Sequence, residues 1–247
     1  MINQENAVEM RNVEMHFNMS KEKLENIKEY FLKLAKRQLM FEDFTALNNV
    51  SFDIKKGDVF GIVGLNGSGK STTLKIISGI LKPTKGTVET AGIIAPLIEL
   101  GAGFDMELTA RENIYLNGSV LGFSKKFMDE KFDDIVDFSE MKDFLDVPMK
   151  NYSSGMVARI GFAIATVTTP DILIVDEILA VGDFLFQQKC EERIHAMMHD
   201  DTTVIIVSHS IEQIERLCKH CLWLEKGKVK MIGEAQEVCN AYRNVSR

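Results

Sequence analysis

The sequence predicts an α/β fold in which helices cover both faces of a mainly parallel sheet. Two short runs rich in Val and Ile, at residues 172–177 and 203–210, alternate with helical patterns at residues 153–167 and 186–198. A third observation is residues 58–81, where an apolar strand leads through a glycine-rich turn into a helix. Continuous apolar runs are typical of strands buried on both faces, and their alternation with helices is typical of parallel sheets.

Length and charge limit the class of protein. The chain has 247 residues, 29 Lys and Arg against 36 Asp and Glu, a net charge of −7 and 45% hydrophobic residues, which is typical of one globular domain. No apolar run approaches the roughly 20 residues that cross a bilayer, and the start, MINQENAVEM, lacks a basic-then-apolar leader. We therefore expect a chain that neither spans a membrane nor is secreted. The excess of acid argues weakly against a dedicated nucleic-acid binder.

The N-terminal part predicts two strands with an insertion between them. Residues 8–17 and 46–54 alternate apolar and polar side chains, as strands with one wet face do. Residues 20–43 carry an amphipathic helical pattern, whose stripe is formed by Leu24, Ile27, Phe31, Leu34 and Gln38. This helical insertion either packs on its own domain or contacts a membrane partner or headgroup surface, helped by Lys28, Lys33, Lys36 and Arg37.

A phosphate-binding loop is predicted at residues 64–71, because GLNGSGKS fits the pattern GxxxxGK[ST] between a strand and a helix. Glycines let backbone N–H groups surround a phosphate, and the N-terminus of the next helix favours negative charge. Lys70 is expected to neutralise the β- and γ-phosphates of a nucleotide, and the Ser71 hydroxyl to hold Mg²⁺. The residues of this loop that are predicted to bind the nucleotide are Gly64, Leu65, Asn66, Gly67, Ser68, Gly69, Lys70, Ser71 and Thr72.

Two later strands end in residues suited to phosphoryl chemistry. The first ends in Asp176 and Glu177; we expect Asp176 near the metal, and Glu177 to orient and deprotonate an attacking water. The second ends in His209, which is predicted to reach the γ-phosphate and stabilise charge that develops there. The predicted catalytic residues are therefore Glu177, His209 and Lys70, with Ser71 and Asp176 at the metal.

The middle of the chain, about residues 105–165, is expected to form a helical subdomain. One helix opens at Thr109, where Glu112 completes a capping box, and residues 125–150 are mainly helical by pattern. Residues 151–156 (NYSSGM) place a small Ser/Gly turn before the helix at 153–167. Such a turn at a helix N-terminus is a second anion site by the same physical argument as the phosphate loop.

The turn formed by Tyr152, Ser153, Ser154, Gly155 and Met156 resembles the LSGGQ signature of ATP-binding cassette (ABC) proteins. Three more segments are similar to the branch that exports polysaccharides such as O-antigen, capsule and teichoic acid: 97–104 (LIELGAGF), 111–117 (RENIYLN) and 179–183 (LAVGD). The resemblance covers essentially the whole chain. It implies a P-loop NTPase (RecA-like) core with a mainly parallel sheet, an antiparallel β subdomain and a helical signature subdomain. Residues 1–247 would form a single nucleotide-binding domain without a C-terminal carbohydrate-binding domain.

The same resemblance implies roles for individual residues. The signature turn would face the γ-phosphate held by a partner subunit, so that a homodimer encloses two ATP molecules, and Asp183 would couple the two sites. Phe17 matches the aromatic that stacks on adenine, and Phe44 competes for that role. Glu99 stands where most cassettes carry a Gln beside the metal. Its coordination of Mg²⁺ is left open, and residues 100–103 are alternatively a contact for the exporter's cytoplasmic gate.

Four cysteines lie in the last quarter of the chain, and Cys218 and Cys221 have the CxxC spacing of a metal or redox site. No second pair stands at the usual ligand spacing, and residues 211–229 have the pattern of a helix that runs into a strand. Small packing residues in a reducing compartment are the favoured interpretation, and a metal or redox site is the alternative.

The resemblance implies an ATP-hydrolysing subunit that uses Mg²⁺ and powers export of a lipid-linked polysaccharide across the cytoplasmic membrane. Its expected partners are ATP, a second copy of the chain and a separate dimeric membrane permease. We expect it on the cytoplasmic face of the cell membrane, with neither nucleic acid nor a glycan bound directly. The alternatives are an ABC ATPase that exports another substrate and a soluble ABC ATPase that acts on nucleic acid or the ribosome.

Overall fold

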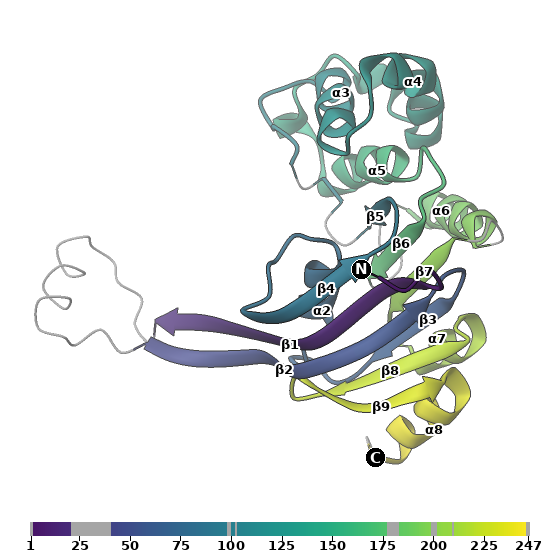
Figure 1. The fold of residues 1–247 in the computed structure, drawn as a ribbon. Helices are drawn as coiled ribbons and strands as arrows, with labels where there is room; N and C mark the ends of the chain where they lie inside the picture. Colours follow the sequence, from purple (N-terminus) through teal and green to yellow (C-terminus); the bar gives the residue numbers. More distant parts are fainter. Residues whose placement is uncertain are drawn as a thin grey trace, which may run out of the picture.

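A computed structural model of the chain describes residues 2–20, 41–97, 100–101, 103–176, 183–198, 202–208 and 210–245. The described residues form two lobes. Figure 1 shows the β-sheets together in one lobe, and helices α3, α4 and α5 in the other. The two lobes meet where α5 approaches β5, β6 and α6.

The smaller sheet is antiparallel, with the order β2-β1-β4 and the bounds Phe41–Lys55, Asn6–Ser20 and Lys85–Thr90. The strands predicted at 8–17 and 46–54 are therefore confirmed, and both are longer than predicted. The predicted bounds of the insertion, 20–43, were wrong because backbone pairing continues as far as Ser20 opposite Phe41. Residues 21–40, which carry the helical pattern, lie outside the described part of the chain.

The larger sheet has the strand order β5-β6-β7-β3-β8-β9. Its strands, in that order, are Ile94–Pro96, Ile172–Asp176, Thr203–Val207, Val59–Val63, His220–Glu225 and Lys228–Glu234. Neighbouring strands are parallel except for β8 and β9, which form an antiparallel hairpin. The mainly parallel sheet expected from the apolar runs is confirmed.

Both faces of the larger sheet are buried because successive side chains point to opposite sides. Ile172, Ile174 and Phe60 face one core, which they share with the smaller sheet and with α2 (Lys70–Ile77). Leu173 and Val175 face a second core. Helices that contribute to the second core include α5 (Ser154–Ala165), α6 (Phe184–Met197), α7 (Ile211–Leu217) and α8 (Ala235–Val245), and the core continues into the helices of the other lobe.

The helical lobe contains α3 (Ala110–Val120), α4 (Lys125–Ser139) and α5. The predicted capping box is present: the Thr109 hydroxyl accepts from the Glu112 N–H at 3.3 Å, and the Thr109 N–H donates to the Glu112 carboxylate at 2.8 Å. The prediction that residues 125–150 are mainly helical is confirmed, with the α-helix itself at Lys125–Ser139. Glu140 adopts a left-handed conformation with φ of 60°, which ends α4, and only 3₁₀ turns follow at Lys142–Phe144 and Met149–Asn151.

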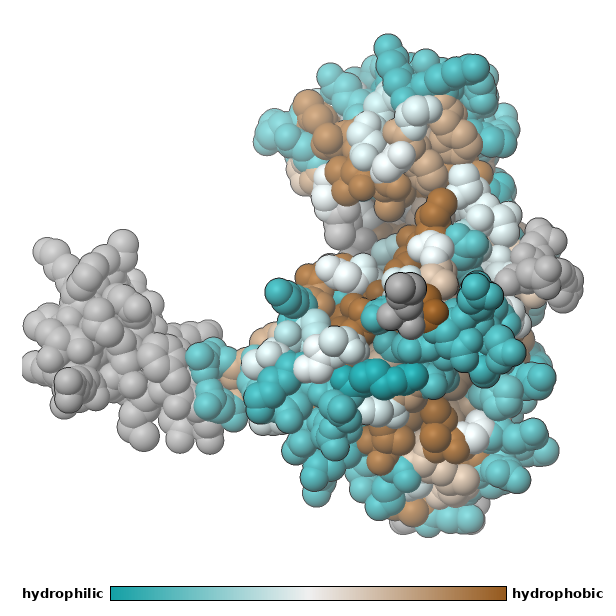
Figure 2. Space-filling view, viewed as in Figure 1, coloured by the Kyte–Doolittle hydropathy of each residue, from teal (hydrophilic) through white to brown (hydrophobic). Residues whose placement is uncertain are grey.

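A hydrophobic hollow separates the lobes. Figure 2 shows hydrophobic residues on both lobes next to this hollow. A cavity of about 130 Å³ lies there, lined by β5, the start of the next loop, α3 and α5. Within the described residues, no helix combines the length and the apolar character that a membrane span requires.

Candidate functional site

The candidate site lies at the carboxyl edge of the larger sheet. In the register of the parallel strands, Asp176 at the end of β6 is opposite Val207 at the end of β7, and Val207 is opposite Ile62 of β3. The phosphate loop starts directly after β3, at Gly64. Asp176 and the loop are therefore at the same edge, with one strand between them, which is where open parallel sheets bind ligands.

The phosphate loop has a backbone shape that depends on two of its glycines. Gly64 and Gly69 have positive φ angles of 151° and 106°. A Cβ on Gly64 would lie 2.3 Å from the carbonyl oxygen of Leu224, and a Cβ on Gly69 would lie 2.7 Å from a methyl group of Leu47. The loop is therefore pressed directly onto β8 and β2, and a side chain at either glycine would push it away.

Lys70 holds the centre of this loop. It is the first residue of α2, and its Nζ donates hydrogen bonds to the carbonyl oxygens of Gly64 at 2.7 Å and Leu65 at 3.1 Å. The residue is only 7% exposed, so its positive charge is enclosed by the loop. A cation inside a glycine-rich loop that opens a helix forms a strong site for phosphate groups.

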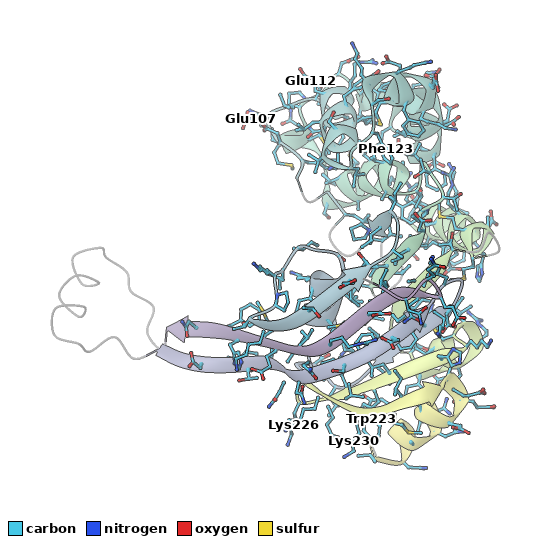
Figure 3. All side chains as sticks on the ribbon, in the orientation of Figure 1. Glu107, Glu112, Phe123, Trp223, Lys226 and Lys230 are labelled. Atoms are coloured by element: carbon cyan, nitrogen blue, oxygen red, sulfur yellow. The ribbon has the colours of Figure 1, made fainter. Side chains whose placement is uncertain are left out.

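The β8–β9 hairpin supports the loop from one side. The Gly227 N–H donates to the carbonyl oxygen of Ser68 at 3.0 Å, and a cavity of about 240 Å³ separates the loop from Trp223 and Tyr242. Figure 3 shows Trp223, Lys226 and Lys230 on this hairpin, far from Glu107, Glu112 and Phe123 in the helical lobe. The phosphate loop is thus built entirely by the sheet lobe.

The metal part of the predicted site is only partly described. Ser71 is exposed at the start of α2, and Asp176 is half-buried at the end of β6. A hydroxyl and a carboxylate are hard oxygen donors, which suit Mg²⁺ when it also binds phosphate oxygens. Glu99, Glu177 and His209 lie outside the described residues. Their predicted roles stay predictions.

The two candidates for adenine stacking are directly opposite each other. Phe17 of β1 pairs with Phe44 of β2 in the antiparallel register. Phe17 is half-buried and packs against the core, whereas Phe44 is 47% exposed. The sequence offered Phe17 first and Phe44 second, and the structure brings both to the same pair of strands.

The signature turn lies at the N-terminus of α5. Ser153 is the N-cap, and its hydroxyl accepts from the Met156 N–H at 3.3 Å. Ser153 and Ser154 are exposed, and Gly155 and Met156 are half-buried. The Tyr152 side chain is anchored on the neighbouring 3₁₀ turn, because its hydroxyl donates to the carbonyl oxygen of Phe144 at 2.5 Å. Burial raises the pKa of Tyr152. The exposed serines and the helix N-terminus leave this turn available to an anion from outside the chain.

Asp183 caps α6 and also pairs with Arg159, a residue that the sequence reasoning missed. The Asp183 carboxylate accepts from the Phe186 N–H at 3.1 Å and from Arg159 Nη2 at 2.6 Å. The backbone N–H of Phe186, aided by the charge of Arg159, lowers the pKa of Asp183. One signal could have revealed Arg159: it is a single charge in the otherwise apolar helix GMVARIGFAIA, and such a charge needs a partner.

The described part of the 97–104 segment contacts the signature helix. A Cβ on Gly161 of α5 would lie 2.8 Å from the backbone nitrogen of Gly101, and a Cβ on Gly101 would lie 2.8 Å from a methyl group of Val157. The loop backbone therefore rests directly on α5. A displacement of one would move the other, because nothing compressible lies between them.

The four cysteines are free and buried. Burial raises the pKa of Cys190 and of Cys218 to about 12. Cys218 and Cys221 pack against Gly61 of β3, where an added Cβ would lie 3.2 and 3.4 Å from their sulfur atoms. In the described part of the chain, no three His, Cys, Asp or Glu side chains are grouped as a metal site would require.

Comparisons with known proteins show which proteins the chain resembles. A family profile described as "ABC transporter" matches residues 47–180. The chain is 42% identical over 211 residues to the O-antigen export system ATP-binding protein RfbB of Klebsiella pneumoniae, covering 85% of this chain and 86% of that one. It is 41% identical over 240 residues to the teichoic acids export ATP-binding protein TagH of Lactiplantibacillus plantarum, covering 97% of this chain and 65% of that one. A solved ATP-binding subunit of an ABC transporter matches with a TM-score of 0.72 at 20% identity, over 96% of this chain and 93% of that one.

Proposed function

The chain belongs to the ABC transporter family, and from this membership we propose that it hydrolyses ATP to power export of a lipid-linked polysaccharide of the O-antigen, teichoic acid or capsule type. It works as a homodimer on the cytoplasmic face of the cell membrane, bound to a separate dimeric permease. The observation that supports this proposal most directly is the position of Lys70, whose ammonium group is enclosed by a glycine-rich loop at the start of α2.

The proposed chemistry divides between the loop and the strand ends. The loop N–H groups and Lys70 bind the β- and γ-phosphates, and Glu177 orients a water for attack on the γ-phosphorus and accepts its proton. As the water oxygen bonds to the γ-phosphorus, the bond from that phosphorus to the β,γ-bridging oxygen breaks and ADP leaves. His209 stabilises the charge that grows on the γ-phosphate oxygens. Ser71 and Asp176, with Glu99 as a further candidate, would hold Mg²⁺, which would supply positive charge to neutralise the phosphates.

The homodimer proposal is supported by the division of the site within one chain. The phosphate loop belongs to the sheet lobe, whereas the exposed serines of the signature turn belong to the helical lobe. Each chain has one copy of each, so two chains arranged head to tail complete two sites. Asp183, at the start of α6, is proposed to couple the sites across the dimer.

The permease partner is supported by the hollow between the lobes. Ile80, Ile93 and Val120 are 48%, 59% and 70% exposed and line this hollow together with Leu100 and Gly101. Exposed apolar side chains around a concave surface are typical of a protein contact. We assign this hollow to a cytoplasmic segment of the permease, whose movement reaches the signature turn through the contact between Gly101 and Gly161.

The central experiment is the variant Glu177→Gln. The expected result is that ATP binding is retained, hydrolysis falls by roughly 100-fold or more, and the chain elutes as an ATP-loaded dimer in size-exclusion chromatography. Glu130→Gln on α4, whose carboxylate makes only a long ion pair with Lys126 at 4.0 Å, is the matched control and should behave like the native chain. Near-native turnover in Glu177→Gln would contradict the general-base role.

The polysaccharide substrate needs a separate test. In a strain that lacks its own exporter ATPase, the chain is expected to restore surface polysaccharide when it is expressed with the permease encoded beside it. The Lys70→Ala variant should fail in the same assay. Copurification with RNA and no effect on surface polysaccharide would instead favour an ABC ATPase with another role.

A further inference from the structure

Three ion pairs in series link four charged side chains from three helices, one of them the signature helix α5, and the backbone of α6 closes the series into a ring. Arg159 of α5 donates from Nη2 to Asp183 and from Nη1 to Glu140, both at 2.6 Å. Lys189 of α6 donates from Nζ to the second oxygen of Glu140 at 3.0 Å. Because Asp183 and Lys189 both belong to α6, the ring begins and ends on the same helix.

The guanidinium of Arg159 is held between an aromatic ring and two carboxylates. Its side chain is 12% exposed and lies over the ring of Phe186, with 4.3 Å between its Cζ and the ring centroid. Its two terminal nitrogens point to two carboxylates on different elements. A planar fork can satisfy both at once, whereas the ammonium group of a lysine is one compact charge.

The acidic members of the ring are fixed by backbone features as well. Glu140 is the left-handed residue that ends α4, and Lys189, followed by Arg159, lowers its pKa. Asp183 is the N-cap of α6. The ring therefore joins the end of α4 and the start of α6 to α5, so its geometry couples the helical lobe to the sheet lobe.

We propose that Arg159 is a positioning residue for ATP hydrolysis, which fixes the signature turn of α5 relative to Asp183 and so sets the surface that one chain presents to its partner. This inference rests on the proposed function. Arg159 lies six residues after Ser153 on the same short helix, so a tilt of α5 moves the exposed serines directly. Without the guanidinium, Asp183 would lose its ion pair with α5, whereas Glu140 would keep its contact with Lys189.

If Arg159 had a purely structural role, its loss would lower the stability of the fold rather than the rate of ATP hydrolysis. Glu140 and Asp183 are 51% and 64% exposed, and ion pairs with such exposed partners add little to stability. A displacement of about 1 Å in a reacting assembly, in contrast, can lower the rate roughly 100-fold. Arg159 should therefore affect turnover much more than folding or nucleotide binding.

The test uses the full chain and measures three quantities: kcat, the Kd for ATP and the thermal midpoint of unfolding. The variants are Arg159→Met, Arg159→Lys, Asp183→Asn and the double variant that combines Arg159→Met with Asp183→Asn. Arg159→Met is expected to lower kcat roughly 10- to 100-fold while the Kd for ATP changes less than about twofold. Arg159→Lys should recover part of the loss. The double variant should be no slower than Arg159→Met alone, because both changes break the same contact.

Arg111→Met is the matched control. Arg111 also pairs with a carboxylate, Asp146 at 2.8 Å, and lies 5.2 Å from the centroid of the Phe132 ring, but both partners belong to the helical lobe. Equal losses of kcat in Arg159→Met and Arg111→Met, or additive losses of kcat in the double variant, would overturn the inference about Arg159 and leave the proposed function standing. A native chain that shows no Mg²⁺-dependent hydrolysis would overturn the proposed function instead. If Arg159→Met does not fold, native kcat in both Arg159→Lys and Asp183→Asn would overturn the inference.

Discussion

Lys70 and Arg159 are two largely buried cations that differ in how far their hydrogen-bond partners lie from them along the chain. Lys70 donates to carbonyl groups five and six residues away, within one local motif. Arg159 pairs with Glu140 and Asp183, which are 19 and 24 residues away on other helices. The first role was predictable from the sequence because the motif contains all its parts. The second was not, because only packing of α4, α5 and α6 brings the partners together.

The thiols of Cys190 and Cys218 are expected to react slowly in the folded chain. Burial raises their pKa to about 12, so at pH 8 only about one thiol in 10,000 is ionised, and only the thiolate reacts. We expect alkylation by iodoacetamide at pH 8 to be at least roughly 1,000-fold slower in the folded chain than in denaturant. Mass spectrometry of quenched samples measures the rate at each cysteine.

The control for this experiment is Ser119→Cys, which places a thiol at an exposed position of α3. It should react as fast in the folded chain as in denaturant. Rapid labelling of Cys218 or Cys221 in the folded chain would contradict the packing interpretation and return the CxxC pair to the metal or redox alternative.

Helix α5 is the element that connects the parts of the proposed machine. Its N-terminus carries the signature turn, its Gly161 supports the backbone of the 100–101 loop, and its Arg159 holds Asp183. The sequence predicted the helix and its cap from local patterns. The sequence did not explain why Gly161 stands in the middle of the helix, where glycine lowers helix stability. The close approach of the Gly101 backbone supplies the reason.

Gly161→Ala is expected to disturb this connection. The new Cβ would lie 2.8 Å from the backbone nitrogen of Gly101, and a backbone cannot rotate away as a side chain can. We expect a loss of about 1–3 kcal/mol of unfolding free energy and a weaker response of ATP hydrolysis to the permease. Chemical denaturation measures the first effect, and ATPase assays with and without the permease measure the second.

Gly118→Ala on α3 is the comparison for this variant. Its added Cβ would meet the side chain of Met128, with 2.4 Å to the sulfur, and a flexible methionine can move aside. It should cost less stability and leave the response to the permease intact. An equal loss of that response in both variants would show that the contact between Gly101 and Gly161 has no special role.

The hollow between the lobes is a feature of the complete fold that the strand and helix patterns do not contain. It combines residues from β5, α3, α5 and the loops between them. Their apolar side chains come together because the two lobes lie next to each other, and Figure 2 shows hydrophobic residues on both lobes beside the hollow.

Ile93→Glu tests the use of this hollow. Ile93 is 59% exposed, so a carboxylate there stays in water in the isolated chain but would be buried against an apolar partner. We expect copurification with the permease to fall at least roughly tenfold, while ATP hydrolysis by the isolated chain is unchanged. Ile232→Glu on β9, at 44% exposure and outside the hollow, is the control. Normal copurification of Ile93→Glu would move the permease contact elsewhere.

The sequence was enough to establish the mainly parallel sheet and the cap at Thr109, and to predict the phosphate loop and the signature turn, because each depends on residues within a few positions of one another. Only the tertiary structure decided the full length of β1 and β2, the end of α4 at Glu140, the contact between Gly101 and Gly161 and the ring around Arg159. These features join residues that are distant in the chain. Their free energy comes from packing and pairing across elements, which local patterns do not contain.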